Sequence, residues 1–463
     1  MKIHNISHTP HRGDRKNRRT MTNSANQSQK PLTTKINSLG NIEIGGCDLV
    51  ELAEKYGTPL YVIDENTLRT ICQDYKKAFE KYPKTNIMYA SKALCTSAVS
   101  AILSQEGIGF DTVSGGEIYT VYKAGVNMNK VLFNGNNKSF DELNLAIDLG
   151  IGRISVDNFY ELALLNTIAQ SKNKTVDILL RITPGIECHT HQYIRTGHLD
   201  SKFGFDLTQI DEAVELILNE YTNLKLHGLH AHIGSQIFET SVYSDEIDIL
   251  CGELARLDEK FGLKLDEINI GGGLGVKYTN TDIPPSTYEI GEIILNALDK
   301  AIKKYHIEPP AIFLEPGRSI ISMCGVTLYT IGSSKQVPKG KKYVSIDGGM
   351  ADNPRPSLYQ AKYSAQLANK KETNETEEIT IGGRFCESGD ILIENITLPK
   401  LDEGDILCVY NTGAYNYSMA SNYNRVEKPA MILVNNGVSE VIVKRETLDD
   451  LIRCDVIPDR LKK

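Results

Sequence analysis

Short hydrophobic runs alternate with amphipathic stretches over the middle of the chain, from about residue 86 to residue 315. A bounded apolar run is typical of a buried strand, and apolar positions three and four apart are typical of a helix. The pattern predicts eight strands, at 86–91, 108–111, 131–135, 153–157, 175–183, 224–233, 267–271 and 311–315. It predicts a helix in every gap, at 96–105, 115–124, 139–149, 158–171, 207–221, 240–261 and 285–304.

This alternation predicts an α/β fold. Strands that are separated by helices form parallel sheets, and eight such units that close on themselves form a TIM-type (β/α)8 barrel. A further helix at about 65–82 precedes the first of these strands, so the predicted barrel spans 65–318. A doubly wound open sheet is the alternative.

The pattern changes after Arg318, where β-branched residues and tyrosines between glycine turns predict a C-terminal antiparallel β domain over 319–463. Residues 36–64 read as short strands around a helix at Leu49–Tyr56, and we expect this segment to join the β domain. The predicted strands of the domain are Val326–Ile331, Tyr343–Ile346, Glu378–Ile381, Asp390–Ile393, Asp405–Tyr410, Ala430–Val434 and Glu440–Val443. Its predicted helices are Ser357–Leu367 and Leu448–Arg453.

Length and composition favour a soluble protein of two domains. The 463 residues exceed what one ordinary core accommodates, and no apolar run is long enough to cross a bilayer. The net charge of −8 argues against nucleic-acid binding. Nine scattered cysteines without a C-x-x-C pair indicate a reducing, cytoplasmic setting and no metal site.

Residues 1–35 differ from the rest, because they carry eight Lys/Arg against one acid and almost no apolar residues. We expect this basic head to be disordered. Since Met21 is a possible start, residues 1–20 are interpreted as a start-site artefact or a solvated tail, and a transit peptide is less favoured.

Polar side chains stand at the carboxyl ends of the predicted strands, where barrel enzymes build their active sites. Lys92, Asp111, Arg181 and Glu315 each end or lie on a predicted strand. Others at these ends are His230, His232, Ser235, the glycines 271–273 and Arg318. Each has an ordinary structural explanation, such as a surface lysine, a core histidine, a tight turn or an ion pair. If they lie together at one end of the barrel, the site contains an amine, a carboxylate and backbone amides that can bind a phosphate.

This combination indicates pyridoxal 5′-phosphate. A partly desolvated lysine, whose pKa falls on burial, can form a Schiff base with the cofactor. Successive glycine amides can hold its phosphate, and a carboxylate beside the pyridine nitrogen keeps that nitrogen protonated, so that the ring accepts electrons.

Six sequence motifs, which occur in the same order as in a known family, lie within residues 57–424. They are Tyr89-Ala90-Ser91-Lys92-Ala93, His230-Ala231-His232-Ile233-Gly234-Ser235-Gln236, Gly271-Gly272-Gly273-Leu274-Gly275, Glu315-Pro316-Gly317-Arg318, Cys386-Glu387-Ser388-Gly389-Asp390 and Gly413-Ala414-Tyr415. With these motifs the chain resembles the barrel-type, alanine racemase-like pyridoxal phosphate decarboxylases, and among them the diaminopimelate decarboxylases.

The resemblance implies a role for each matching residue. Lys92 would hold the cofactor, His232 would stack on its ring, and Glu315 would pair with the pyridine nitrogen. The cofactor phosphate would lie against Ser235, Gly272, Gly273 and Tyr415, next to Arg318. The far end of the substrate would be held by Arg318, Arg355, Tyr359, Glu387 and Tyr415. Asp111 and Arg181 would support these groups.

The implied reaction is the decarboxylation of meso-2,6-diaminopimelate to L-lysine and CO2, the last step of lysine biosynthesis. Guanidinium and carboxylate groups suit a substrate whose unreactive end is a zwitterion. Cys386 would cross the interface of a homodimer and return a proton to the carbon that loses CO2. The segment 185–202 would be a lid, in which Cys188 departs from the small residue that the family leads us to expect.

Two other functions remain open on the sequence. Another decarboxylase of the family would act on ornithine, arginine or carboxynorspermidine, although Glu387 with Arg318 and Arg355 favours a zwitterionic terminus. A non-catalytic relative that binds a partner would not need Lys92 or Cys386, and both are present.

Overall fold

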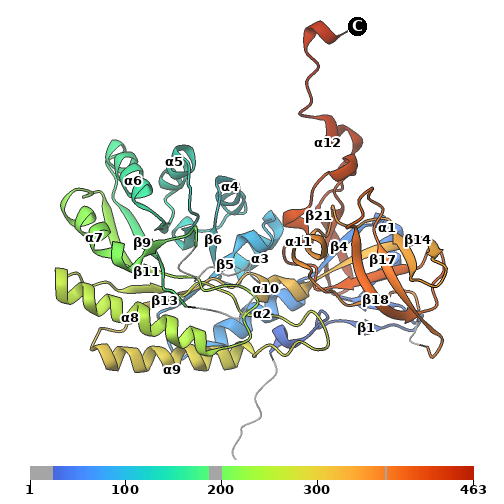
Figure 1. Ribbon diagram of the computed structural model, residues 1–463, viewed down its shortest axis with the longest axis horizontal. Coiled ribbons are helices and arrows are strands. Elements are labelled where there is room, and N and C mark those ends of the chain that lie inside the picture. Colours follow the sequence, from blue (N-terminus) through green and yellow to red (C-terminus); the bar gives the residue numbers. More distant parts are fainter. Residues whose placement is uncertain (1–23, 187–200, 371–372, 463) are drawn as a thin grey trace, which may run out of the picture.

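The computed structural model describes residues 24–186, 201–370 and 373–462, and every structural statement below concerns these residues. Figure 1 shows two parts side by side, a barrel with its surrounding helices and a β domain from which the end of the chain extends. Cys188 and most of the expected lid 185–202 lie outside the described residues. No helix that the structure describes is long and apolar enough to span a membrane.

The barrel is confirmed, because eight parallel strands close on themselves. In spatial order β9, β11, β12, β13, β5, β6, β7 and β8 pair with their neighbours, and the pairing of β8 with β9 closes the ring. The strands are β5 Thr85–Ala90, β6 Gly109–Thr112, β7 Val131–Phe133, β8 Arg153–Val156, β9 Val176–Thr183, β11 Leu224–His230, β12 Glu267–Asn269 and β13 Ala311–Leu314. A two-residue strand that the sequence did not predict, β10 (Phe205–Asp206), also pairs with β9.

Helices fill the gaps between the barrel strands, and α3, α4, α5, α6 and α9 begin at side chains that cap them. Ser139 and Ser286 each form a capping box with the glutamate three residues later, which satisfies backbone N–H groups at the helix start. The helices are α2 Glu65–Ala78, α3 Ser97–Gln105, α4 Gly115–Lys123, α5 Phe140–Leu149, α6 Phe159–Ser171, α7 Ile210–Asn219, α8 Ser241–Phe261 and α9 Thr287–Tyr305. Their buried faces form one hydrophobic core with the strands.

The β domain is built on one sheet of nine strands. Off the path β18-β17-β15-β14-β4-β20-β21, β19 pairs with β14 and β16 pairs with β19. Its strands are β4 Leu60–Asp64, β14 Gly325–Gln336, β15 Lys342–Ile346, β16 Ala365–Leu367, β17 Thr376–Gly382, β18 Ile391–Pro399, β19 Ile406–Tyr410, β20 Ala430–Asn435 and β21 Val438–Val443. Most pairs are antiparallel, but β4–β20 and β15–β17 are parallel.

Smaller elements complete both parts. A three-stranded sheet of β1 (Lys35–Ile36), β2 (Ile42–Ile44) and β3 (Cys47–Asp48) precedes α1 (Leu49–Tyr56). The short helix α10 (Arg318–Ile321) links the barrel to β14, and α12 (Leu448–Ile452) lies near the end of the chain.

The predicted helix 357–367 is wrong in its second half. The helix α11 spans only Arg355–Tyr359, and it ends at Gln360, which has the left-handed φ of 53°. Residues 365–367 instead form β16, an edge strand that pairs with β19. The pairing with a neighbouring strand outweighs the local helical pattern.

Residues 24–35 are ordered, unlike the disordered head that the sequence predicts there. Ser24 and Asn26 are buried. Asn26 donates from Nδ2 to the Pro285 carbonyl at 2.9 Å, and the Thr287 amide donates to Ser24 Oγ at 2.8 Å. Further along, the Gln29 carbonyl accepts from Asn411 Nδ2 at 2.9 Å. This segment therefore joins the barrel to the β domain, because short polar side chains can satisfy buried backbone groups.

We predict that Asn26→Ala destabilises the protein, because it removes a buried side chain and leaves the half-buried Pro285 carbonyl without its donor. A lost buried hydrogen bond of this kind costs about 1–3 kcal/mol. Thermal unfolding measures the effect as a lower Tm. A chain starting at Met21 is the control and should unfold as the full chain does, because it retains Asn26. An unchanged Tm for Asn26→Ala would show that the segment contributes nothing to stability.

Candidate active site

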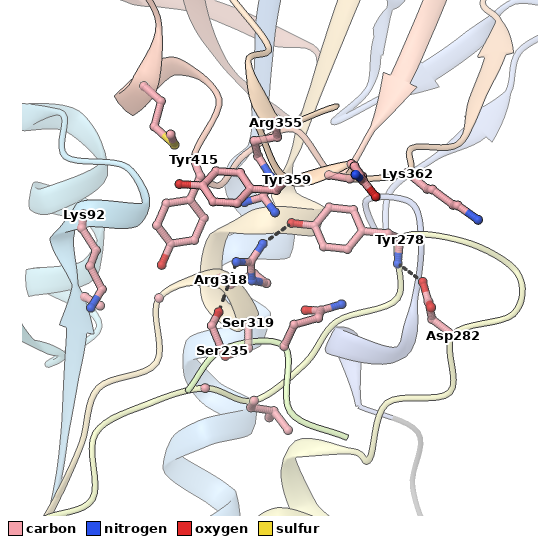
Figure 2. A pocket seen from close by; sticks show the side chains of 18 of the residues that line it. Lys92, Ser235, Tyr278, Asp282, Arg318, Ser319, Arg355, Tyr359, Lys362 and Tyr415 are labelled. Carbon is pink, nitrogen blue, oxygen red and sulfur yellow. Dashed lines mark hydrogen bonds between the residues drawn. The ribbon is translucent and has the colours of Figure 1, made fainter. Parts of the chain in front are cut away.

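A cavity of about 530 Å³ lies where the carboxyl ends of the barrel strands meet the β domain. The barrel contributes Lys92, His232, Ser235, Gly273, Glu315 and Arg318 to its lining, and the β domain contributes Arg355, Tyr359 and Tyr415. Figure 2 shows these two groups of side chains facing one another, with Lys92 at one side and the two arginines near the tyrosines. The structure therefore brings most of the predicted site residues together.

Lys92 stands in a short 3-10 turn directly after β5, with its side chain exposed to the cavity. Desolvation by itself lowers the pKa of an amine, as the sequence predicted. The nearby carboxylates of Asp111 and Glu315 outweigh that effect and raise the pKa of Lys92 above its ordinary value. The prediction of a lowered pKa is therefore wrong for the free lysine, because burial was considered without the charges that surround the amine.

Glu315 follows β13 and is buried. Its Oε1 accepts from Asn269 Nδ2 at 2.7 Å and from Asn134 Nδ2 at 2.9 Å. Burial by itself raises the pKa of a carboxyl, but the imidazole of His230 and the amine of Lys92 hold the pKa of Glu315 well below its usual range. Glu315 therefore stays ionised in the barrel mouth.

Asp111, near the end of β6, shares a hydrogen-bond donor with Glu315. The amide of Asn134 donates to Asp111 Oδ1 at 2.6 Å as well as to Glu315. Burial and the negative charge of Glu315 raise the pKa of Asp111 well above its ordinary value. Two carboxyls this close cannot both ionise readily, so Glu315 ionises first and Asp111 ionises only at higher pH, where its charge acts on the amine of Lys92.

Desolvation lowers the pKa of both histidines of β11 and its following loop, and it lowers that of His232 well below its ordinary value. His230 is buried, with Nδ1 2.8 Å from Ser155 Oγ and Nε2 3.5 Å from Glu315 Oε2. His232 lines the cavity, and its Nδ1 accepts from the Gly272 amide at 3.1 Å. His230 thus supports Glu315, whereas His232 faces the cavity.

The glycines 271–273 follow β12 in a conformation that a side chain would prevent. A Cβ on Gly272 would lie 2.1 Å from the Glu315 carbonyl oxygen, and one on Gly273 would lie 2.6 Å from the Gly234 carbonyl oxygen. Gly273 also has a φ of +110°, which favours glycine. The loop therefore lets backbone amides approach a ligand closely.

Arg318 and Arg355 are buried at the other side of the cavity. Neither forms an ion pair with a carboxylate of the described residues, and the Nε atom of each lacks a hydrogen-bond partner there. The Tyr415 ring lies 4.8 Å from Arg318 Cζ and 5.5 Å from Arg355 Cζ. Two buried guanidiniums without a counter-ion form a site for an anionic group.

Cys386, Glu387 and Arg181 are among the predicted site residues that do not line this cavity. Cys386 and Glu387 are exposed in the turn between β17 and β18, where Asn424 Oδ1 accepts from the Cys386 amide at 3.0 Å, and neither residue lines the cavity. Arg181 is buried within β9, with Nη1 3.9 Å from Asp157 Oδ1.

The sequence analysis missed Asn134, Asn269 and Tyr278. Asn134 and Asn269 stand at the carboxyl ends of β7 and β12, so an inspection of all eight strand ends would have found them. Tyr278 lies beyond the glycine loop and contacts both arginines. No motif marks it, because only the fold brings it to them.

Comparison with known proteins identifies relatives over most of the chain. Residues 67–322 match the family described as "Pyridoxal-dependent decarboxylase, pyridoxal binding domain". The diaminopimelate decarboxylase of Synechocystis sp. is 48% identical over 95% of both chains, and that of Bacillus subtilis is 46% identical over 92% of this chain and 97% of its own. The crystal structure of diaminopimelate decarboxylase from M. jannaschii in complex with L-lysine superposes with a TM-score of 0.88 at 35% identity, covering 93% of this chain and 99% of that one.

We predict that Asp111→Asn lowers the pKa of Lys92, because Asp111 is the strongest of the charges that raise it. The measurement is the pH dependence of the rate at which the amine reacts with added pyridoxal phosphate, and its midpoint should move to lower pH. Asp177→Asn is the matched control, because Asp177 lies near the opposite end of the barrel, 2.8 Å from His227. A midpoint that stays in place or rises would refute this account of the amine.

Proposed function

The chain belongs to the pyridoxal-dependent decarboxylases and, within them, to the diaminopimelate decarboxylases, and from this premise we propose how its own residues carry out the reaction. The enzyme uses pyridoxal 5′-phosphate to decarboxylate meso-2,6-diaminopimelate to L-lysine and CO2. The assignments of single residues that follow are our proposal, and each is supported by the geometry described above.

The residues of the cavity fit pyridoxal phosphate. The glycine loop leaves room for a phosphate group against backbone amides, and Lys92 and the ionised carboxylate of Glu315 both line the cavity. When bound, the cofactor supplies an electron sink that makes the carbon–carboxylate bond easier to break. The protein has to hold the cofactor, orient it and keep its ring nitrogen protonated.

In this proposal Lys92 would hold the cofactor through Nζ, and the phosphate would be held by Ser235, Gly272, Gly273 and Tyr415. His232 is neutral, so it packs on the ring without opposing a proton on the ring nitrogen. Glu315 would pair with that nitrogen and keep the proton there, because an opposite charge raises the pKa of the protonated nitrogen. Asn134 and Asn269 fix the carboxylate through Oε1.

The single observation that favours diaminopimelate is the pair of buried arginines, which have no counter-ion among the residues that the structure describes. The end of the substrate that does not react carries a carboxylate, which Arg318 and Arg355 would bind with Tyr359 beside them. Ornithine has only an amine at that end, and burying an amine against two guanidiniums would be unfavourable. The arginines thus support diaminopimelate over the decarboxylase substrates that lack this carboxylate.

Cys386 and Glu387 enter the proposal through a second subunit. They are exposed and do not line the cavity of their own chain, so we assign them to the active site of the partner in a homodimer. There Cys386 Sγ would give its proton to the carbon that has lost CO2, and Glu387 would bind the far ammonium of the substrate. A C2 dimer would form two such shared sites from one interface. We also assign this biosynthetic enzyme to the cytoplasm.

Assays of purified holoenzyme with meso-diaminopimelate, ornithine and arginine, side by side, test this function. We expect CO2 release from diaminopimelate with kcat/KM at least about 100-fold above that for either other substrate, since a charged group left unpaired at a buried site costs several kcal/mol. The same assays with heat-denatured enzyme are the control for uncatalysed CO2 release. Faster turnover of ornithine or arginine would replace diaminopimelate as the substrate.

We predict that Lys92→Ala and Cys386→Ala complement each other when mixed. Each variant alone should be nearly inactive. After subunit exchange, half of the randomly paired dimers carry one site with both residues intact, so activity should return to about a quarter of the wild-type value. Analytical gel filtration with differently tagged subunits verifies the exchange. If exchange is complete and no activity returns, Lys92 and Cys386 act within one chain.

A further inference from the structure

Tyr278 is a buried tyrosine that lies beside both arginines of the cavity. It follows the glycine loop, seven residues past Gly271 in the sequence, and its side chain is almost fully enclosed. Figure 2 shows its phenol directed at Arg318, with Arg355 and Tyr359 close by. None of the roles assigned above uses this residue.

The phenol oxygen accepts a hydrogen bond from Arg318 Nη1 at 2.8 Å. The other terminal nitrogen of Arg318, Nη2, donates to Ser235 Oγ at 3.2 Å. A guanidinium is planar and rigid, so partners on both terminal nitrogens fix the direction of its plane. Tyr278 and Ser235 therefore determine where the remaining N–H groups of Arg318 point.

Both guanidiniums act on the phenol. The centre of the Tyr278 ring lies 5.8 Å from Arg318 Cζ and 5.7 Å from Arg355 Cζ, distances at which a cation is attracted to the ring. Burial by itself raises the pKa of a phenol, yet Arg318 and Arg355 lower the pKa of Tyr278 below its ordinary value. The ring thus lies within attractive distance of both guanidiniums.

The backbone around Tyr278 is held by both parts of the protein. The Tyr278 amide donates to Asp282 Oδ2 at 3.0 Å, and its carbonyl accepts from Ser364 Oγ at 2.9 Å. The preceding carbonyl, of Lys277, accepts from Asn411 Nδ2 at 2.9 Å. Since Ser364 and Asn411 belong to the β domain, the phenol has a defined position at the domain boundary.

We propose that Tyr278 is a positioning residue for substrate selection, which orients Arg318 toward the carboxylate at the unreactive end of the substrate. This inference rests on the proposed function, because it assigns that carboxylate to the arginines. The ligands it concerns are α-amino acids whose carboxylate enters the arginine pair. Ligands without this carboxylate do not depend on the orientation of Arg318.

Tyr278→Phe tests the proposal, because it keeps the ring and removes only the hydroxyl. L-lysine, the product, retains the carboxylate, whereas cadaverine is the same diamine without it. Inhibition constants of both are measured against diaminopimelate turnover, together with KM and kcat. We expect weaker binding of lysine and a higher KM by about tenfold, the loss of one hydrogen bond to a charged group. Cadaverine binding and kcat should change less than about twofold.

Tyr363→Phe is the matched control. The Tyr363 ring packs edge-on against Tyr278, with the centroids 5.4 Å apart, and its hydroxyl donates to Asn416 Oδ1 at 3.3 Å. It removes a buried hydroxyl from the same cluster without touching Arg318. Lysine and cadaverine should bind to this variant as they bind to the wild type. The visible absorbance of bound cofactor verifies that each variant is folded.

If Tyr278→Phe does not fold, Ser322→Ala is the variant that tests the proposal. Ser322 Oγ lies 3.3 Å from the phenol oxygen and 3.2 Å from the Asn411 carbonyl oxygen. Removing it loosens the phenol but retains Tyr278, so lysine binding should weaken relative to cadaverine binding in the same direction and by less. An unchanged lysine-to-cadaverine ratio in the folded variant overturns the proposal.

The same data separate this inference from the proposed function. If the wild-type enzyme binds lysine no better than cadaverine, the arginines do not bind a carboxylate and the substrate assignment fails. If the wild type prefers lysine and Tyr278→Phe retains the full preference, the substrate assignment stands and only the role of Tyr278 is refuted.

Discussion

The ionised carboxylate of Glu315 is buried at the centre of the barrel mouth, and the neighbouring groups are arranged around its charge. Two amides donate to its Oε1, and His230 and Lys92 lower its pKa. The same charge raises the pKa of Asp111 and contributes to the raised pKa of Lys92. A buried charge is tolerated only when it is paired and hydrogen-bonded, so a change in Glu315 would alter the protonation of the whole group.

The opposite side of the cavity holds positive charge, and it is assembled from both domains. Arg318 begins the helix that leaves the barrel, whereas Arg355 begins α11 of the β domain. The segment 24–35 and the hydrogen bonds of Asn411 and Ser364 fix the position of one domain relative to the other. The relative position of the domains therefore determines the distance between the arginines, and with it the length of substrate that fits between them and Lys92.

The sequence predicted the barrel well, because strand–helix alternation is a local pattern and all eight strands lie within a few residues of the predicted positions. The convergence of Lys92, His232 and Glu315 on one end of the barrel could also be predicted, since the carboxyl ends of all barrel strands lie at the same end. The prediction failed where distant groups decide the outcome. The raised pKa of Lys92 depends on Asp111 and Glu315, which are distant in the sequence. The strand β16 forms because it pairs with β19. Residues 24–35 adopt a defined structure because they form hydrogen bonds with Pro285 and Thr287.

The protonation state of the cofactor's ring nitrogen tests the central role of Glu315 most directly. The measurement is the ¹⁵N NMR shift of pyridoxal phosphate labelled at that nitrogen and bound to the wild-type enzyme, compared with Glu315→Gln. The account predicts a protonated nitrogen in the wild type at neutral pH and an unprotonated one in Glu315→Gln, because the opposite charge is then lost. An unprotonated nitrogen in the wild type, or a protonated one in both proteins, would contradict it.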